Sequence, residues 1–302
     1  MRLVLDWFAN PDHVPLHAVA LDAELVEPSD PDEPLALVAQ GEAELALNYQ
    51  PNVTLARSRG APVRAVGVLV DRVLDTLMVR ADGPVRAVRD LAGRRVACAV
   101  EPFDRVMFAA MAQHAGLETG SWEFVDVGFD FTRALLDGRV DAVMGAFRNY
   151  EVVEADELGV PVRIFELADH GVPPFYQLVL VARDDVLRAR RDDLGRVVRA
   201  VGEGMARTRE HPDEAFAAYL RAHPDHDDRF RRRAFAATLG AFARTLAQDA
   251  ARWSAFAAFL VVRGLIASAP DARDLFTNEL VALEPQEMTR RRGRVSPGGA
   301  AR

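Results

Sequence analysis

The sequence predicts an α/β protein of two lobes, joined by a hinge and separated by a ligand cleft. The chain has 302 residues, half of them hydrophobic, which is enough for two medium-sized cores. Residues 30–51 and 128–149 share one pattern: an Asp near a helix start, a short helix, a terminal Gly, a strand and a polar-aromatic loop. Two lobes built alike, each with such a loop at the carboxyl end of a strand, would close on a ligand between them.

The stretch LDWFANPDH, residues 5–13, begins the first lobe and ends its first strand. Residues 3–8 alternate and end apolar, which predicts a buried strand, and the Asn-Pro-Asp sequence at 10–12 then favours a turn or helix start. Trp7 and Asn10 therefore lie near the carboxyl end of a strand, where open α/β sheets bind ligands. They could stack on a ring and hydrogen bond to its edge. The alternative, which the sequence leaves equally open, is that Trp7 is a core residue and Asn10 only caps a helix.

The remaining elements alternate in the same way. In the first lobe we expect strands at 43–47, 65–70 and 76–80. The second lobe is expected to span 81–180 and to contain a short helix and a strand within 88–100, helices at 103–114 and 149–158, and strands at 122–127, 140–144 and 162–167. Two crossovers, near residues 80 and 180, then form the hinge.

The last third of the chain predicts a helical block. A strand at 177–182 leads back to the first lobe, and from 185 to about 267 the pattern is helical, with breaks at His211-Pro212 and His223-Pro224. We expect this block to pack on the first lobe, which then comprises 1–80 and 181–288. The tail, 289–302, is basic and rich in Gly and Pro, and is predicted to be disordered.

Composition excludes several classes of function. The formal net charge of −8 argues against nucleic acid and anionic membranes as partners. The single cysteine, Cys98, lies in an apolar strand pattern and predicts a small buried hydrophobe rather than a disulfide, zinc or iron–sulfur site. All 37 basic residues are arginine, so no side-chain amine can form a Schiff base with pyridoxal phosphate. No hydrophobic run reaches the length of about 18 residues that a membrane span needs. We expect neither a cofactor nor a metal.

Three local patterns contain residue types that could carry chemistry. The stretch 101–105, EPFDR, could hold an anion at a helix start, but it has no Gly and predicts a helix cap instead. The stretch 223–228, HPDHDD, looks metal-like, but a surface turn between helices is preferred. Phe147 and Glu151 are four residues apart and share a helix face, so a ring could stack on Phe147 while Glu151 accepts hydrogen bonds from its amino groups. A core Phe and a Glu favoured by the helix dipole is the alternative that the local sequence leaves open.

Four stretches that together span about residues 1–185 resemble the NMT1/THI5-like family. They are LDWFANPDH from residue 5, VEPSDPDEPLALVAQGEAELALNYQP from 26, VGFDFTRALLDGRVDAVMGAFRNYE from 127 and ADHGVPPFYQLVLVA from 168. The resemblance implies a type II periplasmic-binding-protein fold. One branch of this family is the substrate-binding protein of ABC importers for thiamine pyrimidine precursors such as formyl-aminopyrimidine. The other is a pyrimidine synthase, which makes the pyrimidine phosphate from a histidine and pyridoxal phosphate.

The resemblance also implies a set of ligand-binding residues. In the binding-protein branch aromatic side chains sandwich the pyrimidine while Asn and Glu read its edge, and by motif match these residues are Trp7, Asn10, Phe147 and Glu151. Weaker candidates on the same basis are Tyr49, His13, His170 and Tyr176.

The chain departs from the family at several positions. Family members often have Tyr where Phe147 stands and Trp where Arg148 stands. The synthase branch carries a cysteine-rich iron motif and a cofactor lysine, which have no counterpart here. Residues 17–28 are shorter than the usual helix and turn between the first two strands. We therefore expect a stunted first helix, which would loosen the first lobe and the placement of His13.

These observations lead us to expect a substrate-binding protein, not an enzyme, that captures a thiamine-type aminopyrimidine by hinge closure. Its other partner would be an ABC transporter permease, with no direct insertion into the membrane. The alternatives are a pyrimidine phosphate synthase and a divergent homologue that binds another small heterocycle or a sulfonate. The function implies a periplasmic or extracellular, membrane-associated location. No signal peptide precedes the first strand, so we expect an export segment to be encoded upstream of Met1, and a cytoplasmic location is the alternative.

Overall fold

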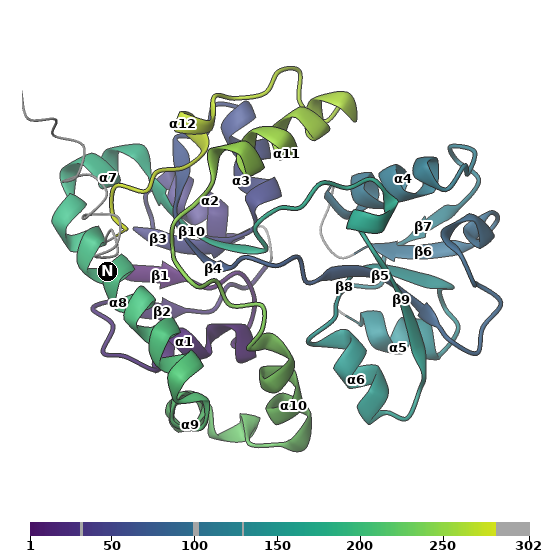
Figure 1. Cartoon of the computed structure of the whole chain (residues 1–302), viewed down its shortest axis with the longest axis horizontal. Coiled ribbons are helices and arrows are strands. Elements are labelled where there is room, and N and C mark those ends of the chain that lie inside the picture. Colours follow the sequence, from purple (N-terminus) through teal and green to yellow (C-terminus); the bar gives the residue numbers. More distant parts are fainter. Residues whose placement is uncertain (31–32, 99–102, 129, 282–302) are drawn as a thin grey trace, which may run out of the picture.

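The computed structural model describes residues 1–30, 33–98, 103–128 and 130–281. These residues form two lobes, each built on one five-stranded sheet that helices cover (Figure 1). The predicted disordered tail, 289–302, lies outside the described residues. The two-lobed α/β architecture is the one expected from the sequence.

The sheet of the first lobe has the strand order β2-β1-β3-β10-β4. The strands are β1 (Arg2–Val4), β2 (Glu24–Val26), β3 (Leu45–Asn48), β4 (Val63–Val70) and β10 (Leu178–Arg183). Strands β1, β2 and β3 are parallel, and β10 inserts antiparallel between β3 and β4. The core strands are buried almost throughout, because helices cover both faces and the chain supplies continuous apolar runs here. The return strand predicted at 177–182 is therefore present as β10.

The first helix of this lobe is short, as the length of residues 17–28 predicts. A 3₁₀ turn (η1, Pro11–His13) leads into α1 (Val14–His17), which has a single turn. Helices α8 (Arg191–Glu210) and α9 (Pro212–Ala222) pack against α1. The backbones of α1 and α8 approach closely, since a Cβ atom built on Gly204 would lie 2.1 Å from the carbonyl oxygen of Pro15. The lobe thus holds its shortened first helix by close packing against α8.

The sheet of the second lobe has the strand order β7-β6-β8-β5-β9. The strands are β5 (Asp75–Arg80), β6 (Arg95–Cys98), β7 (Glu123–Val125), β8 (Ala142–Phe147) and β9 (Val162–Glu166). The prediction that placed strand 76–80 in the first lobe is wrong, because β5 pairs antiparallel with both β8 and β9. The crossovers therefore lie between Val70 and Asp75 and between Glu166 and Leu178, and we propose these segments as the lobe boundaries in place of 80 and 180.

The helices of the two lobes end where glycine permits a left-handed residue. Gly41, Gly116 and Gly159 have φ of +83°, +78° and +73° after their helices, as the predicted helix ends require. The helices are α2 (Glu33–Gln40) and α3 (Gln50–Ser58) in the first lobe, and η2 (Val88–Leu91), α4 (Phe103–His114), α5 (Phe131–Leu136), α6 (Glu151–Glu157) and η3 (Ala168–His170) in the second. Cys98 is buried in the core of the second lobe, as expected.

The C-terminal block breaks at 211 and 223 as predicted, but it does not pack on the first lobe alone. It comprises α7 (Asp184–Ala189), α8, α9, η4 (Pro224–His226), α10 (Arg229–Thr238), α11 (Ala250–Val262) and α12 (Ala272–Leu275). Helix α10 contacts α6 of the second lobe. Helix α11 inserts Phe256 into the second core, where it meets Phe103 and Phe175. Both helices therefore contact both lobes, α10 beside α6 on one side of the molecule and α11 on the other (Figure 1). Among the described residues, no helix is both long and apolar enough to cross a membrane.

Candidate functional site

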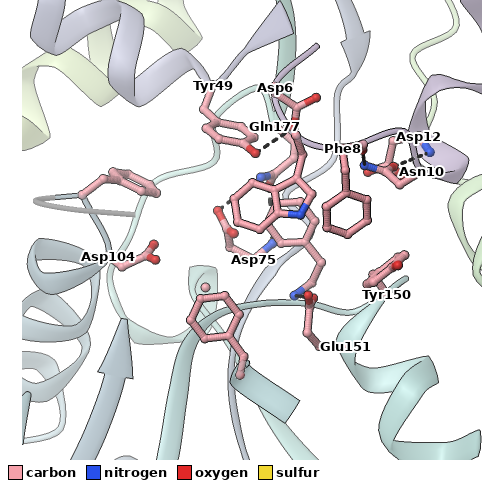
Figure 2. A pocket seen from close by; sticks show the side chains of 15 residues that line it. Asp6, Phe8, Asn10, Asp12, Tyr49, Asp75, Asp104, Tyr150, Glu151 and Gln177 are labelled. Carbon is pink, nitrogen blue, oxygen red and sulfur yellow. Dashed lines mark hydrogen bonds between the residues drawn. The ribbon is translucent and has the colours of Figure 1, made fainter. Parts of the chain in front are cut away.

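A pocket lies between the two lobes and encloses about 610 Å³ of space, part of it open to solvent. Its aromatic lining residues are Trp7, Phe8, Tyr49, Phe103, Phe131, Phe147 and Tyr150. Its polar lining residues are Asp6, Asn10, Asp12, Asp75, Asp104, Glu151 and Gln177, most of which Figure 2 shows around the central space. Five of these are acidic, and the described lining contains no basic side chain.

The loop after β1 supplies Trp7 and Asn10. Strand β1 ends at Val4, earlier than the predicted strand, so both residues lie in the loop that follows its carboxyl end. Asn10 Oδ1 accepts a hydrogen bond from the backbone N–H of Asp12 at 2.9 Å, and Asn10 Nδ2 donates to the carbonyl of Phe8 at 3.1 Å. Asn10 is therefore the cap of η1 and a lining residue at once. One hydrogen on its Nδ2 is not used by these two bonds.

A buried network behind this loop orients Tyr49. His13 is fully buried, and its Nδ1 accepts from the backbone N–H of Asn10 at 3.2 Å, which places the ring proton on Nε2. Nε2 then donates to Asp6 Oδ1 at 2.8 Å, and the Tyr49 hydroxyl donates to Asp6 Oδ2 at 2.7 Å. Burial next to Asp6 raises the pKa of Tyr49, so the phenol stays neutral. His13 is held on both ring nitrogens, so the shortened first helix has not left it loosely placed.

The last residue of β8, Phe147, and the first residue of α6, Glu151, line the pocket from the second lobe. Gly145 is the extra residue of a bulge opposite Thr76 and Leu77, and its φ of +87° favours glycine there. Glu151 Oε2 accepts from the backbone N–H of Phe147 at 2.7 Å. Burial raises the pKa of Glu151 to about 7. The Phe147 ring meets the Tyr49 ring edge to face, with centroids 6.3 Å apart, so the two lobes touch at this wall.

The crossover segments contribute a carboxylate and an amide that the sequence did not single out. Gln177 Oε1 accepts from the backbone N–H of Leu74 at 2.8 Å, and Gln177 Nε2 donates to Asp75 Oδ2 at 3.3 Å. Burial, and then the nearby charge of Asp104, raise the pKa of Asp75 well above its usual range. Asp104, in the first turn of α4, was predicted only as part of a helix cap, yet it lines the pocket. No local pattern could have paired two carboxylates from such distant segments.

Contacts beside the pocket join the two lobes. Asn149 Nδ2 donates to Asp12 Oδ1 at 2.7 Å and to Thr238 Oγ1 at 2.8 Å, which joins the second lobe to η1 and α10. Burial raises the pKa of Asp12 to about 6. On the surface of the same side, Arg233 of α10 pairs with Asp156 and Glu157 of α6, each at 2.5 Å. These contacts join the two lobes on this side of the molecule.

The structure brings together five of the eight predicted site residues. Trp7, Asn10, Tyr49, Phe147 and Glu151 line the pocket, whereas His13, His170 and Tyr176 do not.

The three others have structural surroundings of their own. His13 lies behind the pocket in the Asp6 network. His170 lies in η3 against the rings of His114 and Phe165. The Tyr176 hydroxyl accepts from the backbone N–H of Asp249 at 2.8 Å. We therefore do not carry these three forward as ligand contacts. No cluster of three or more potential metal ligands occurs among the described residues, so the histidines at 223 and 226 form no such site.

Comparisons with known proteins agree on one family. A family model described as NMT1/THI5 like matches residues 18–215. A Haemophilus influenzae protein named for thiamine biosynthesis is 30% identical over 281 residues, covering 89% of this chain and 88% of that protein. The formylaminopyrimidine-binding protein of Halalkalibacterium halodurans is 31% identical over 229 residues, covering 73% of this chain and 69% of that protein.

More distant similarities extend over most of the chain. The 4-amino-5-hydroxymethyl-2-methylpyrimidine phosphate synthase of Legionella pneumophila is 25% identical over 297 residues, covering 94% of this chain and 93% of that protein. Among solved structures, the periplasmic aliphatic sulphonate binding protein SsuA from Escherichia coli superposes with a TM-score of 0.70 at 17% identity, covering 91% of this chain and 90% of that one. The fold is thus that of periplasmic binding proteins.

Proposed function

Because the chain belongs to the NMT1/THI5-like family, we propose that it is a substrate-binding protein that captures a thiamine-type aminopyrimidine for an ABC importer. The observation that carries the proposal is the pocket itself, which combines aromatic walls from both lobes with carboxylates and amides and has no basic side chain in its described lining. Rings on opposite lobes can enclose a flat heterocycle, and carboxylates accept hydrogen bonds from amino groups at its edge.

Four residues would make the principal contacts. Trp7 and Phe147 come from opposite lobes and would stack on the ring, which explains why binding and lobe closure would be coupled. Glu151 would accept from the exocyclic amine and from a protonated ring nitrogen. Asn10 would add its remaining amide hydrogen to a ring nitrogen. None of these contacts makes or breaks a bond, so the arrangement serves capture and release.

The acidic lining disfavours anionic ligands. A sulfonate or phosphate would enter a pocket with five acidic side chains and no arginine in its described lining, where like charges repel and ion-pair partners are missing. The sulfonate alternative thus has only fold similarity on its side. We propose that the pocket accepts the unphosphorylated pyrimidine.

The synthase alternative rests on the similarity to the Legionella enzyme. Its chemistry does not fit the residues present. The chain offers no lysine for an aldimine, one buried cysteine, and no cluster of metal ligands among the described residues. We expect pyridoxal phosphate to form no borohydride-trappable adduct on a side chain of this protein. Such an adduct, with the α-amino group excluded as its source, would favour the synthase alternative.

Calorimetric titration tests the proposed function directly. We expect formylaminopyrimidine and 4-amino-5-hydroxymethyl-2-methylpyrimidine to bind, and the pyrimidine phosphate and an alkanesulfonate to bind at least about tenfold more weakly, since tenfold corresponds to about 1.4 kcal/mol. Mass spectrometry of small molecules released from the purified protein gives an independent answer. Failure of every aminopyrimidine to bind, with a folded protein, would overturn the proposal.

A further inference from the structure

Gln177 lines the pocket at the point where the two crossovers meet. Its side chain is 2% exposed, and Figure 2 shows it at the pocket wall beside Asp75. Gln177 belongs to the second crossover, and Leu74, to which it is hydrogen bonded, belongs to the first. The amide of Gln177 is therefore part of the pocket wall and also part of the connection between the lobes.

The hydrogen bonds of Gln177 fix the direction in which its amide points. Oε1 accepts from the backbone N–H of Leu74 at 2.8 Å and from that of Asp75 at 3.4 Å. Exchanging the amide oxygen and nitrogen would set an NH2 group against these two N–H donors, so the hydrogen-bond network assigns the orientation. The NH2 group therefore lies on the side of the Asp75 carboxyl, whose Oδ2 accepts from Nε2 at 3.3 Å.

One hydrogen of this NH2 group remains unused. An amide nitrogen carries two hydrogens, and the described residues supply one acceptor to Nε2, the carboxyl of Asp75. Burying a donor without a partner costs free energy. Most polar side chains of the described pocket lining are carboxylates, which accept hydrogen bonds and leave the pocket with few donors. The unused hydrogen of Gln177 therefore suits an acceptor atom of the ligand.

We propose that this hydrogen binds an acceptor oxygen on the substituent at position 5 of the pyrimidine; this inference rests on the proposed function. In that function Glu151 and Asn10 take the amine and the ring nitrogens, so the acceptor that is left is on the substituent. A formyl carbonyl or a hydroxyl oxygen supplies it, whereas a methyl group supplies none. Gln177 thus selects the ligand by its substituent, separately from the residues that read the ring.

Three probes with the same ring test this inference. They are the N-formyl derivative of 4-amino-5-aminomethyl-2-methylpyrimidine, 4-amino-5-hydroxymethyl-2-methylpyrimidine and 4-amino-2,5-dimethylpyrimidine. The first two carry an acceptor oxygen on the substituent, and the dimethyl probe carries none. For the parent protein we expect calorimetry to show the first two binding about three- to tenfold tighter than the dimethyl probe, the range for one hydrogen bond between neutral groups.

The variant Gln177→Glu isolates the donor. A carboxylate oxygen can still accept from the backbone N–H of Leu74, but an oxygen replaces the NH2 group. We expect the two oxygen-bearing probes to bind about tenfold or more weakly, and the dimethyl probe to change by less than about threefold. Gln248→Glu is the matched control, because Gln248 is another buried glutamine that does not line the pocket, and it should leave the ratios of the three affinities unchanged. If either variant fails to fold, Gln177→Met and Gln248→Met replace the pair.

NMR of the parent protein gives a second readout that needs no variant. The two Nε2 protons of Gln177 are distinguishable, because one of them is bonded to Asp75. The other proton should lie further downfield in the complex with the N-formyl probe than in the complex with the dimethyl probe, because a hydrogen bond deshields it. Identical shifts of both protons in the two complexes would contradict the inference.

The outcomes separate the two proposals. If Gln177→Glu weakens all three probes alike, or leaves all three unchanged, the amide only joins the crossovers or contacts the ring. Either result overturns the inference about the substituent and leaves the proposed function standing. If none of the three probes binds to the parent protein, the proposed function itself fails.

Discussion

Replacing Glu151 by Gln removes one negative charge from the pocket and keeps the shape of the side chain. In the structure Glu151 Oε2 accepts from the backbone N–H of Phe147, and the Gln carbonyl can take over that bond. The amide nitrogen then stands where a carboxylate oxygen would accept from the amino group of the ligand. The lost interaction is one hydrogen bond to a charged group, about 1.5–3 kcal/mol. The dissociation constant should rise about 10- to 150-fold.

The assay is calorimetric titration with the aminopyrimidine at pH 8, where a carboxyl with a pKa of about 7 is mostly ionised. Lowering the pH through 7 protonates Glu151 in the parent, so the gap between parent and variant should narrow toward pH 6. Glu154→Gln is the matched control, since Glu154 lies one turn on and does not line the pocket, and it should change affinity by less than about 1 kcal/mol.

Two results would refute the reasoning. The first is that Glu151→Gln binds within about threefold of the parent at pH 8, which corresponds to less than about 1 kcal/mol of binding free energy. In that case Glu151 only stabilises the start of α6. The second is that Glu154→Gln weakens binding as much as Glu151→Gln does. Affinity would then depend on the total negative charge of α6 and not on a direct contact of Glu151 with the ligand. Thermal melts of both variants check that each is folded.

Three further predictions follow from the same geometry. Ligand should change the intrinsic fluorescence, and Trp7→Phe should abolish that change although two other tryptophans remain; a full signal in the variant would remove Trp7 from the site. Burial raises the pKa of Asp12 from 3.8 to about 6, so the proton that Asp12 holds in the folded protein stabilises the fold below pH 4, and this contribution is lost as the pH rises through 6. Urea titrations of the parent and of Asp12→Asn should show it. Relative to the variant, the parent should lose about 2–3 kcal/mol of unfolding free energy between pH 4 and 7. Gly204→Ala should lower stability by about 1–3 kcal/mol because its Cβ would press on the Pro15 carbonyl, whereas Gly240→Ala, with open space around it, should not; equal melting temperatures would show that α1 and α8 can separate.

The order and type of most elements could be predicted from the sequence, because their signals are local. Helices end at glycine because only a residue without a Cβ adopts the left-handed conformation cheaply, and Gly116 and Gly159 mark the ends of α4 and α6 as predicted. Proline removes a backbone donor, so the His-Pro pairs at 211 and 223 begin new helices. The motif around Trp7, and the motif match that named Phe147 and Glu151, likewise pointed to residues that line the pocket. The expectation that Phe147 and Glu151 share a helix face is wrong, because Phe147 ends β8 and α6 begins only at Glu151.

Long-range pairing decided the rest. An apolar strand such as β5 has the same local pattern in either sheet, and only its hydrogen bonds with β8 and β9 assign it to the second lobe. The sequence predicted His13 as a ligand contact because it does not show what the ring touches. In the structure both ring nitrogens of His13 are hydrogen bonded, to Asp6 and to the backbone N–H of Asn10, so the residue is structural.

Asp75 and Asp104 show the limit most clearly. Asp75 begins a strand and Asp104 begins a helix, and in the sequence each is an ordinary acidic residue at the start of an element. Their charges meet only after two segments far apart in the chain fold against the same pocket. Residue types and spacing determine local backbone conformation, because that energy depends on near neighbours. Burial and charge–charge distance depend on the whole fold, so the electrostatics of this site were decided by the tertiary structure.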